Sequence, residues 1–250
     1  MGKNLVIGVF SDIHGNLEAL KATIYDGKKN GVANWICLGD LFFKGPQPLE
    51  TAKYIESMIE KDTVTFIKGN TDEFITQSLS NNLVCNSNPE LAPYLDFIQS
   101  KLPKQFVIWL DNLKNSFTFN IADQEFNFFH SSLKGLNIST YPDMNDIDLL
   151  NALSPKTELH KTNLFYGHIH LPYMRKIKDI SIFNTGSVGM PFDMDYRASY
   201  IIIDIDDENG LIKKSSFIKV HYDLEKLIAA AKKVCLPGLE QYLNILKLTI

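Results

Sequence analysis

The sequence contains seven side chains of types that bind metal ions, each shortly after an apolar run, at widely separated places. They are Asp12, His14, Asp40, Asn70, His130, His168 and His170. The set combines carboxylates, imidazoles and an amide oxygen and contains no thiolate. This mixture suits borderline divalent ions such as Mn, Fe, Co, Ni or Zn, and does not suit a site for soft metals. The residue types therefore predict a divalent metal site.

Seven ligands are more than one ion of four to six coordination positions can use, but they fit two divalent ions that share a bridging carboxylate. Two such ions with two carboxylates and a hydroxide carry a net charge of about +1, which still attracts a phosphate anion. A pair of ions about 3.5–4 Å apart can activate a water and hold phosphoryl oxygens. This favours phosphoryl-transfer chemistry.

The spacing of two pairs predicts that each pair reaches one pocket. Asp12 and His14 are two residues apart, as are His168 and His170. On an extended backbone, residues i and i+2 lie on the same face. A glycine stands directly before three of the seven candidates: Asp40, Asn70 and His168. Glycine permits tight turns and close approach of the backbone.

The first 70 residues predict the elements that position these groups. Short β-branched runs at 4–10, 35–40 and 63–70 read as strands that end in turns, and 17–29 and 48–61 read as amphipathic helices. A βαβαβ order predicts parallel strands with right-handed crossovers. The carboxyl ends of parallel strands share one edge of a sheet, where ligands bind.

The remainder of the chain predicts a mixture of strands and loops within one domain, residues 1–250. We expect strands at 105–110, 116–121, 125–130, 163–167, 173–177, 180–184 and 199–205, and an edge strand at 214–220. Residues 80–103 read as loop and helix, residues 133–160 as a loop with a short helix at 146–153, and two helices end the chain. The irregular segments 78–103 and 133–160 are expected to shape the substrate cleft.

Composition limits the classes of protein. The net charge of −4 argues against general nucleic-acid binding, and 45% hydrophobic residues are ordinary for a globular domain. No apolar run approaches the roughly 18–20 residues of a membrane span. The N-terminal stretch lacks a cleavage site, and three cysteines without a CxxC motif indicate reduced thiols. We expect a cytoplasmic protein without a membrane partner; an oligomer stays open.

The motif series "DIH", "GD", "GNTD", "FFHSS" and "GHIH" resembles that of the calcineurin-like metallophosphoesterases. The later stretch "NTGSVGMPFDMDYRASY" resembles the smaller bacterial phosphodiesterase-like branch of that superfamily. The resemblance implies an α/β fold, a two-sheet mixed β-sandwich flanked by helices. It also implies a binuclear centre, with Mn as the expected metal and a metal-bridging hydroxide as the nucleophile.

The resemblance also assigns roles to individual residues. One ion would be bound by Asp12, His14 and His170. The other ion would be bound by Asn70, His130 and His168. Asp40 would bridge the two ions, and Asp40, Asn70 and His168 would be the catalytic residues.

Three further residues are candidates for substrate binding, each with a structural alternative. Asn16 could contact substrate or cap a helix. Thr71 stands where many relatives have a histidine, and could contact phosphate or act as a helix N-cap. Arg197 could form a fork to phosphate or pair with Asp193 or Asp195.

A threonine hydroxyl is a poor general acid, so leaving groups that need protonation are disfavoured. We therefore expect a phosphodiester or nucleoside polyphosphate substrate, with dinucleoside polyphosphates as one option. A phosphomonoesterase or protein phosphatase is the first alternative, although Phe43-Lys44-Gly45 replaces the end of the GDxxDRG motif. A non-catalytic, metal-stabilised scaffold that binds proteins is the second, although a scaffold has no need of seven converging ligands.

Overall fold

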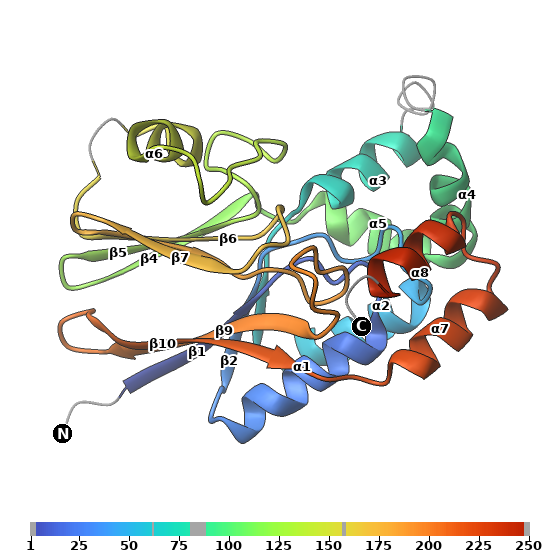
Figure 1. The fold of residues 1–250 in the computed structure, drawn as a ribbon, viewed down its shortest axis with the longest axis horizontal. Helices are drawn as coiled ribbons and strands as arrows, with labels where there is room; N and C mark the ends of the chain where they lie inside the picture. Colours follow the sequence, from blue (N-terminus) through green and yellow to red (C-terminus); the bar gives the residue numbers. More distant parts are fainter. Residues whose placement is uncertain (1–3, 62, 81–88, 157–158, 248–250) are drawn as a thin grey trace.

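The computed structural model describes residues 4–61, 63–80, 89–156 and 159–247, and builds them into two stacked five-stranded sheets flanked by helices (Figure 1). The first sheet has the order β10-β9-β1-β2-β3, with bounds Ile212–Val220, Ala198–Asp206, Asn4–Phe10, Asn34–Cys37 and Val64–Phe66. The second has the order β4-β5-β6-β8-β7, with bounds Ser116–Ile121, Gln124–Phe129, Thr162–Tyr166, Ile180–Asn184 and Tyr173–Ile177. The expected two-sheet α/β fold is confirmed.

Each sheet contains three neighbouring parallel strands, and this arrangement decides where the loops meet. In the first sheet β1, β2 and β3 run parallel, and in the second β5, β6 and β8 do so. The antiparallel strands lie outside these triplets, with β10 at one edge of the first sheet. The predicted parallel opening and the edge strand are therefore confirmed.

The space between the sheets is filled by β-branched residues of the first sheet and by phenylalanines of the second. Alternate residues of β1, such as Ile7 and Val9, face this layer, as the period of a strand requires. Phe165 lies stacked between Phe128 and Phe183, at ring-centroid distances of 4.9 and 4.6 Å. This apolar layer fixes the two sheets against each other, and so fixes the loops at their ends.

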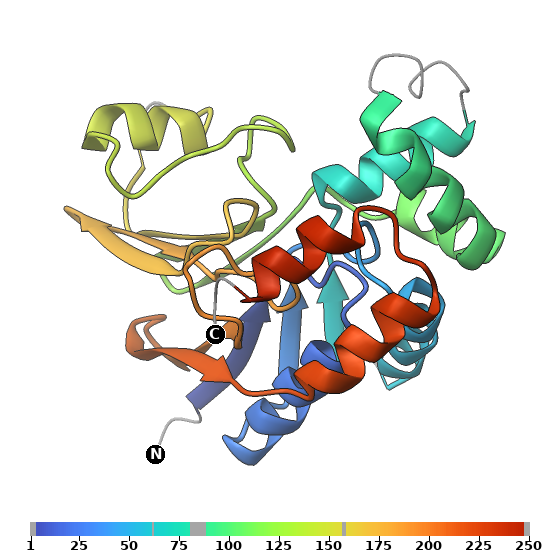
Figure 2. The same cartoon turned by 45° about the vertical axis from the view of Figure 1, so that its right-hand side comes forward.

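Helices cover the outer faces (Figures 1 and 2). Helices α1 (Leu17–Lys29) and α2 (Pro48–Ile59) pack on the outer face of the first sheet, around the buried Trp35. Helix α6 (Asp146–Leu153) covers the second sheet through Leu149 and Leu153. The remaining helices gather at one end of the sandwich: α3 (Asn70–Ser80), α4 (Ala92–Lys101), α5 (Lys104–Asp111), α7 (Leu224–Lys233) and α8 (Leu239–Lys247). Within the described ranges, no helix combines the length and apolar character that a membrane crossing needs.

One predicted strand is wrong. Residues 105–110 lie in helix α5, which packs beside α3. The apolar run misled the prediction because its burial follows a helical period: Phe106 and Leu110 are buried, while Ile108 between them is 55% exposed. The short helix at 146–153 is confirmed, as are helices near the C-terminus. Part of the predicted loop at 80–103 lies outside the described residues.

Candidate metal centre

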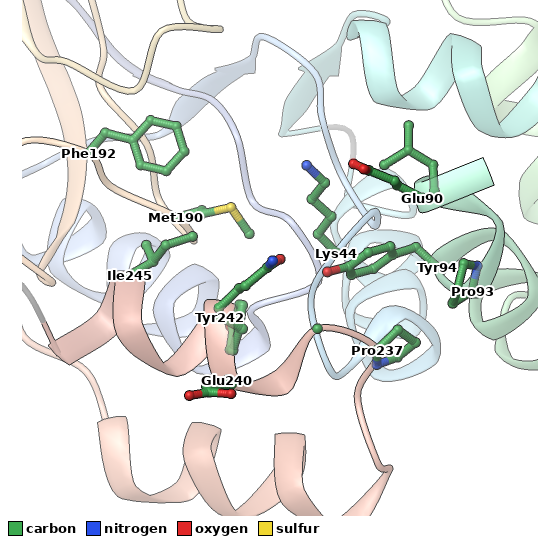
Figure 3. Close-up of a pocket in the computed structure, with 13 residues that line it drawn as sticks. Lys44, Glu90, Pro93, Tyr94, Met190, Phe192, Pro237, Glu240, Tyr242 and Ile245 are labelled. Carbon is green, nitrogen blue, oxygen red and sulfur yellow. The ribbon is translucent and has the colours of Figure 1, made fainter. Parts of the chain in front are cut away.

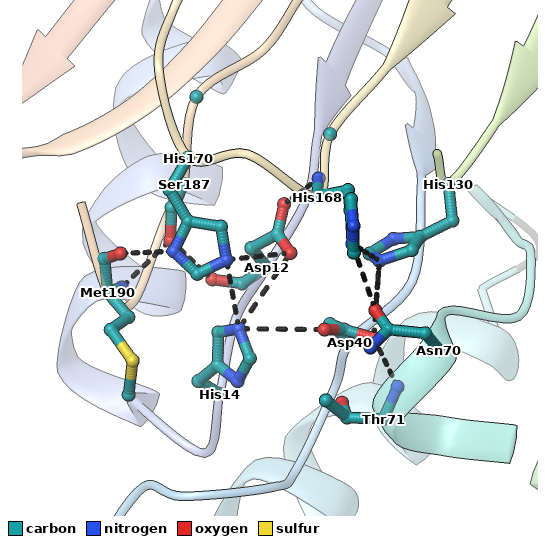
Figure 4. Close-up of polar contacts among 12 residues, drawn as sticks. Asp12, His14, Asp40, Asn70, Thr71, His130, His168, His170, Ser187 and Met190 are labelled. Carbon is teal, nitrogen blue, oxygen red and sulfur yellow. Dashed lines mark hydrogen bonds and ion pairs between the residues drawn. The ribbon is translucent and has the colours of Figure 1, made fainter. Parts of the chain in front are cut away.

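All seven predicted ligands meet at the carboxyl ends of the parallel strands (Figure 4). The loops after β1, β2 and β3 carry the ligands of the first sheet, and the loops after β5 and β6 carry those of the second. Two groups of side chains could each hold a metal ion: Asp12, His14 and His170, and also Asp12, Asp40 and His130. The site therefore joins groups that lie about 160 positions apart in the sequence.

The first group lies between the loops after β1 and β6. Oδ1 of Asp12 is 3.1 Å from Nε2 of His170 and 3.7 Å from Nε2 of His14. The two imidazoles approach each other with Nε2 to Nε2 at 3.3 Å. All three residues are buried, so bulk solvent screens their interactions little.

Around His130, which belongs to the second group, the side chains of Asn70 and His168 also meet. Oδ1 of Asn70 is 2.7 Å from Nε2 of His130 and 3.1 Å from Nδ1 of His168. Asp40 lies between His130 and the first group: its Oδ1 is 3.5 Å from Nε2 of His130, and its Oδ2 is 3.7 Å from Nε2 of His14. This central position is the one that a bridging carboxylate needs.

Backbone carbonyl groups fix the tautomers of three histidines. Nδ1 of His14 lies 2.9 Å from the carbonyl oxygen of Phe43, and Nδ1 of His130 lies 2.8 Å from that of Leu38. Nδ1 of His170 contacts the carbonyl oxygen of Met190 in the same way. A carbonyl only accepts, so in each neutral ring Nδ1 carries the proton and Nε2 presents a lone pair to the site.

Lone pairs facing one another repel, and a cation between them removes that repulsion. The opposed Nε2 atoms of His14 and His170 form such a pair, as do Nε2 of His130 and Oδ1 of Asn70. Oδ1 of Asp12 is buried, and no hydrogen bond to it is found among the described residues. The residues present therefore fit a divalent metal centre.

The imidazole of His168 has the opposite orientation to the other three rings, with Nδ1 directed into the site. Its Nδ1 faces Asn70 and His130, and its Nε2 lies 3.1 Å from the hydroxyl oxygen of Ser139. Burial, followed by the nearby His130, lowers the pKa of His168 to about 4. His168 is thus neutral near pH 7, as a metal ligand must be. Ser139 belongs to the irregular loop after β5, and sequence reasoning did not single it out.

Replacing Ser139 by alanine removes the partner of Nε2 and leaves the ring of His168 free to turn. We expect the variant to bind Mn about tenfold more weakly, the lower end of the effect of losing a ligand-orienting hydrogen bond. Calorimetric titration of the metal-free protein with Mn measures the affinity. Ser215→Ala on β10 is the matched control, and equal affinities of both variants would contradict the orienting role.

Left-handed backbone at five predicted ligands replaces the extended backbone that the spacing suggested. The five φ angles lie between 46° and 67°, at Asp12, His14, Asp40, His168 and His170. The explanation from extended backbone is therefore wrong, although each pair does reach one site. Such conformations are unfavourable for residues with a side chain, and they persist where the surroundings enforce them, often at functional sites.

Two glycines confirm the predicted close approach of the backbone. A Cβ on Gly69 would lie 2.1 Å from Oδ1 of Asp40, and a Cβ on Gly167 would lie 2.6 Å from Oδ2 of Asp12. Nonbonded atoms cannot approach this closely, so any side chain at either glycine would displace a carboxylate of the site. The backbone N–H of His168 donates to the same Oδ2 of Asp12, at 3.0 Å.

Asp72, the last residue of "GNTD", holds two of the loops together. Its fully buried carboxylate accepts hydrogen bonds from the backbone N–H groups of Asp40, Leu41 and Gly69, at 2.8, 2.9 and 2.9 Å. Burial and the adjacent Asp40 carboxylate raise the pKa of Asp72 to about 6. Its position inside the motif was the available signal, but sequence reasoning gave it no role.

The stretch "NTGSVGM" fixes the Asp12 loop from the other side. The Ser187 hydroxyl donates to the carbonyl oxygen of Asp12 at 2.8 Å, and the N–H of Gly189 donates to the same oxygen at 2.9 Å. The side chain of Asn184 donates to the carbonyl oxygen of Gly167, next to His168. This stretch therefore positions two of the predicted ligands, Asp12 and His168, through the backbone.

The charges of the first group support one another. Burial opposes ionisation of Asp12, but His170 and His14 outweigh it and hold the pKa of this carboxyl well below its usual range. Burial likewise opposes protonation of His14, while Asp12 and Asp40 raise the pKa of the imidazole. Both shifts have one origin: two buried carboxylates attract positive charge to this place.

The three predicted substrate contacts lie in different surroundings. Asn16 is fully buried and caps α1: its Oδ1 accepts from the N–H of Ala19, and its Nδ2 donates to the carbonyl oxygen of Gly189. Arg197 is paired with Asp195 through Nε and a terminal nitrogen. Among the described contacts, none joins Arg197 to the metal-ligand cluster.

Thr71 touches the cluster through its backbone, because its N–H donates to Oδ1 of Asp40 at 2.9 Å. Its buried hydroxyl has no hydrogen-bond partner in the described part of the chain, so it makes no capping bond. Helix α3 begins one residue earlier, at Asn70. The N-cap alternative is therefore wrong, and contact with phosphate stays a prediction.

The two-sheet fold with an Asp/His cluster at the strand ends is that of a metallophosphoesterase. The family model of the calcineurin-like phosphoesterase superfamily domain matches residues 5–208. The chain belongs to this superfamily, as the motifs had indicated. It is a metal-dependent hydrolase that acts on phosphoesters.

Individual proteins are similar to this chain in sequence or in fold. The chain is 28% identical to an uncharacterized protein of Methanocaldococcus jannaschii, over 93% of this chain and 94% of that one. Its fold is similar to that of a hypothetical protein of Pyrococcus horikoshii, with a TM-score of 0.79, 22% identity, and coverage of 96% and 97%. It is also similar to a metallophosphoesterase of Sphaerobacter thermophilus, with a TM-score of 0.74, 23% identity, and coverage of 98% and 99%.

Proposed function

We propose that this protein is a binuclear metallophosphodiesterase that hydrolyses phosphodiester or nucleoside polyphosphate bonds. The observation that carries the proposal is the opposition of unprotonated nitrogen and oxygen atoms at two neighbouring places, His14 with His170 and His130 with Asn70. One cation at each place would remove this opposition, and Asp40 lies between the two places. Dinucleoside polyphosphates are one substrate of this class.

In this proposal one ion is held by Asp12, His14 and His170. The second is held by Asn70, His130 and His168, and Asp40 is shared. Two bound divalent ions, Mn by preference, supply an activated water and neutralise charge on the phosphoryl group. The protein's own share is to keep the lone pairs directed inward through the carbonyl groups of Phe43, Leu38 and Met190.

The substrate preference follows from the surroundings of Thr71. Its hydroxyl is buried, and a threonine does not ionise near neutral pH, so it cannot serve as an acid for a leaving alkoxide. Aryl, nucleotide and pyrophosphate leaving groups need little protonation. This supports diesters and polyphosphates over simple alkyl monoesters.

The test compares diester and monoester hydrolysis with and without metal. The chain is stripped with a chelator, reloaded with Mn, and assayed on methyl p-nitrophenyl phosphate, p-nitrophenyl phosphate and diadenosine polyphosphates. We expect no turnover without metal, and turnover that favours a diester or dinucleotide after reloading.

His168→Ala should abolish most of this turnover, and the exposed His160→Ala should not. A metal content of two ions per chain is expected by elemental analysis. Stronger turnover of the monoester would favour the phosphomonoesterase alternative, and a folded chain that binds no metal would favour the scaffold.

A further inference from the structure

A pocket of about 650 Å³, whose lining Figure 3 shows, includes two residues that contact the predicted metal ligand His170. Its walls come from four segments that are far apart in the sequence: Lys44 after β2, residues 90–94 at the start of α4, Met190 and Phe192 after β8, and residues 237–245 of the turn before α8 and of α8 itself. A pocket of this volume has the size of sites that bind nucleotides and similar small molecules.

Two residues belong both to this pocket and to the surroundings of the metal ligand His170. The carbonyl oxygen of Met190 contacts Nδ1 of His170. The ring of Phe192 lies stacked on the imidazole of His170, with 4.4 Å between the centroids and 20° between the planes. The pocket therefore lies next to His170, on the far side of Met190 and Phe192.

Phe192 leaves an aromatic surface open at the pocket. The side chain is 51% exposed, which is unusual for a phenylalanine, and in Figure 3 it faces the opening between Met190 and Lys44. An aromatic face of this kind is a platform on which planar rings stack. Two further aromatic residues, Tyr94 and Tyr242, also line the pocket.

The opposite wall is held rigidly and carries a cation. Tyr94 packs against Phe43 at 5.9 Å between centroids, and its hydroxyl lies so close to Gly238 that a Cβ there would be 1.8 Å away. Lys44 directs its ammonium group into the opening, and the carboxylates of Glu90 and Glu240 belong to the lining as well (Figure 3). The lining therefore complements a planar ring through its aromatic side chains, and it offers one ammonium group and two carboxylates for polar contacts.

We propose that this pocket binds the nucleoside part of the substrate, with the base stacked on Phe192 and a phosphate beside the metal centre. The inference rests on the proposed function and narrows it to nucleotide diesters and polyphosphates. The wall formed by residues 237–245 lies beyond residue 208, where the match to the family model ends. Part of the pocket therefore lies outside the stretch that the family model covers.

Binding measurements test the pocket separately from catalysis. The experiment compares two ligands that differ in the base, adenosine 5′-monophosphate and ribose 5-phosphate. Calorimetry gives the affinity of the Mn-loaded protein for each. We expect the nucleotide to bind at least about tenfold more tightly, the typical effect of one stacked base. Phe192→Leu keeps the apolar bulk and should remove this difference, and Phe192→Trp should keep it.

Phe217→Leu, on the exposed side of β10, is the matched control and should preserve the preference. Equal affinity of the unaltered protein for both ligands, or an unchanged preference in Phe192→Leu, would overturn the inference. Failure of the proposed function looks different: methyl p-nitrophenyl phosphate, which has no base, would then not be hydrolysed by the Mn-loaded protein.

Discussion

Asp40→Asn is expected to lower Mn-dependent diester hydrolysis by at least about 100-fold, the scale of losing one electrostatic stabiliser of the transition state. The substitution keeps the shape of the side chain and removes its negative charge. Asp40 lies between His14 and His130, so the variant loses a negative charge at the centre of the cluster. The kcat of the reloaded variant measures the loss.

The same variant should remain at least as stable as the unaltered chain when both are free of metal. The carboxylates of Asp40 and Asp72 repel each other, and this repulsion contributes to the raised pKa of Asp72. Removing one charge relieves it. Thermal unfolding of both metal-free proteins checks this, and a much lower Tm of Asp40→Asn would show that lost activity reflects lost structure.

Asp72→Ala is expected to destabilise the fold by about 3 kcal/mol and to weaken Mn binding by about 10- to 100-fold. The substitution leaves three buried backbone N–H groups without their acceptor, at Asp40, Leu41 and Gly69. Loss of these bonds loosens the loop that carries Asp40. Urea unfolding measures the first effect, and calorimetric titration with Mn measures the second.

Asp143→Ala, at an exposed position, is the matched control and should change the free energy of unfolding by less than about 0.5 kcal/mol. A variant at Asp72 that retained both its stability and its metal affinity would show that the loops after β2 and β3 are held by other contacts. In that case the helix N-terminus at Thr71 would be the main support of Asp40.

Much of this arrangement could be predicted from the sequence because strand ends are marked by residue type. Short apolar runs followed by Asp12, Asp40 and Asn70 identify parallel strands and the edge where their loops meet, and the structure has them there. The motif series identified the family correctly. Such signals are local, so one sequence is enough to detect them.

Features that depend on contacts between distant segments could not be predicted. The apolar run 105–110 forms a helix because it packs beside α3, and a pattern of six residues does not contain that information. The partners of Ser139 and Asp72 lie on other loops. The left-handed backbone at His168 and His170 likewise arises from the surrounding loops, since histidine adopts this conformation only uncommonly.

The opposed ligands come from both sheets, and this has a consequence for how the chain folds. His14 belongs to the first sheet and His170 to the second, and 156 residues separate them in the sequence. No early folding intermediate with only one sheet formed can possess the site. Metal affinity therefore reports docking of the sandwich, and a bound ion acts as a cross-link between its halves: metal at 100 times its Kd adds about 2.7 kcal/mol to the free energy of unfolding.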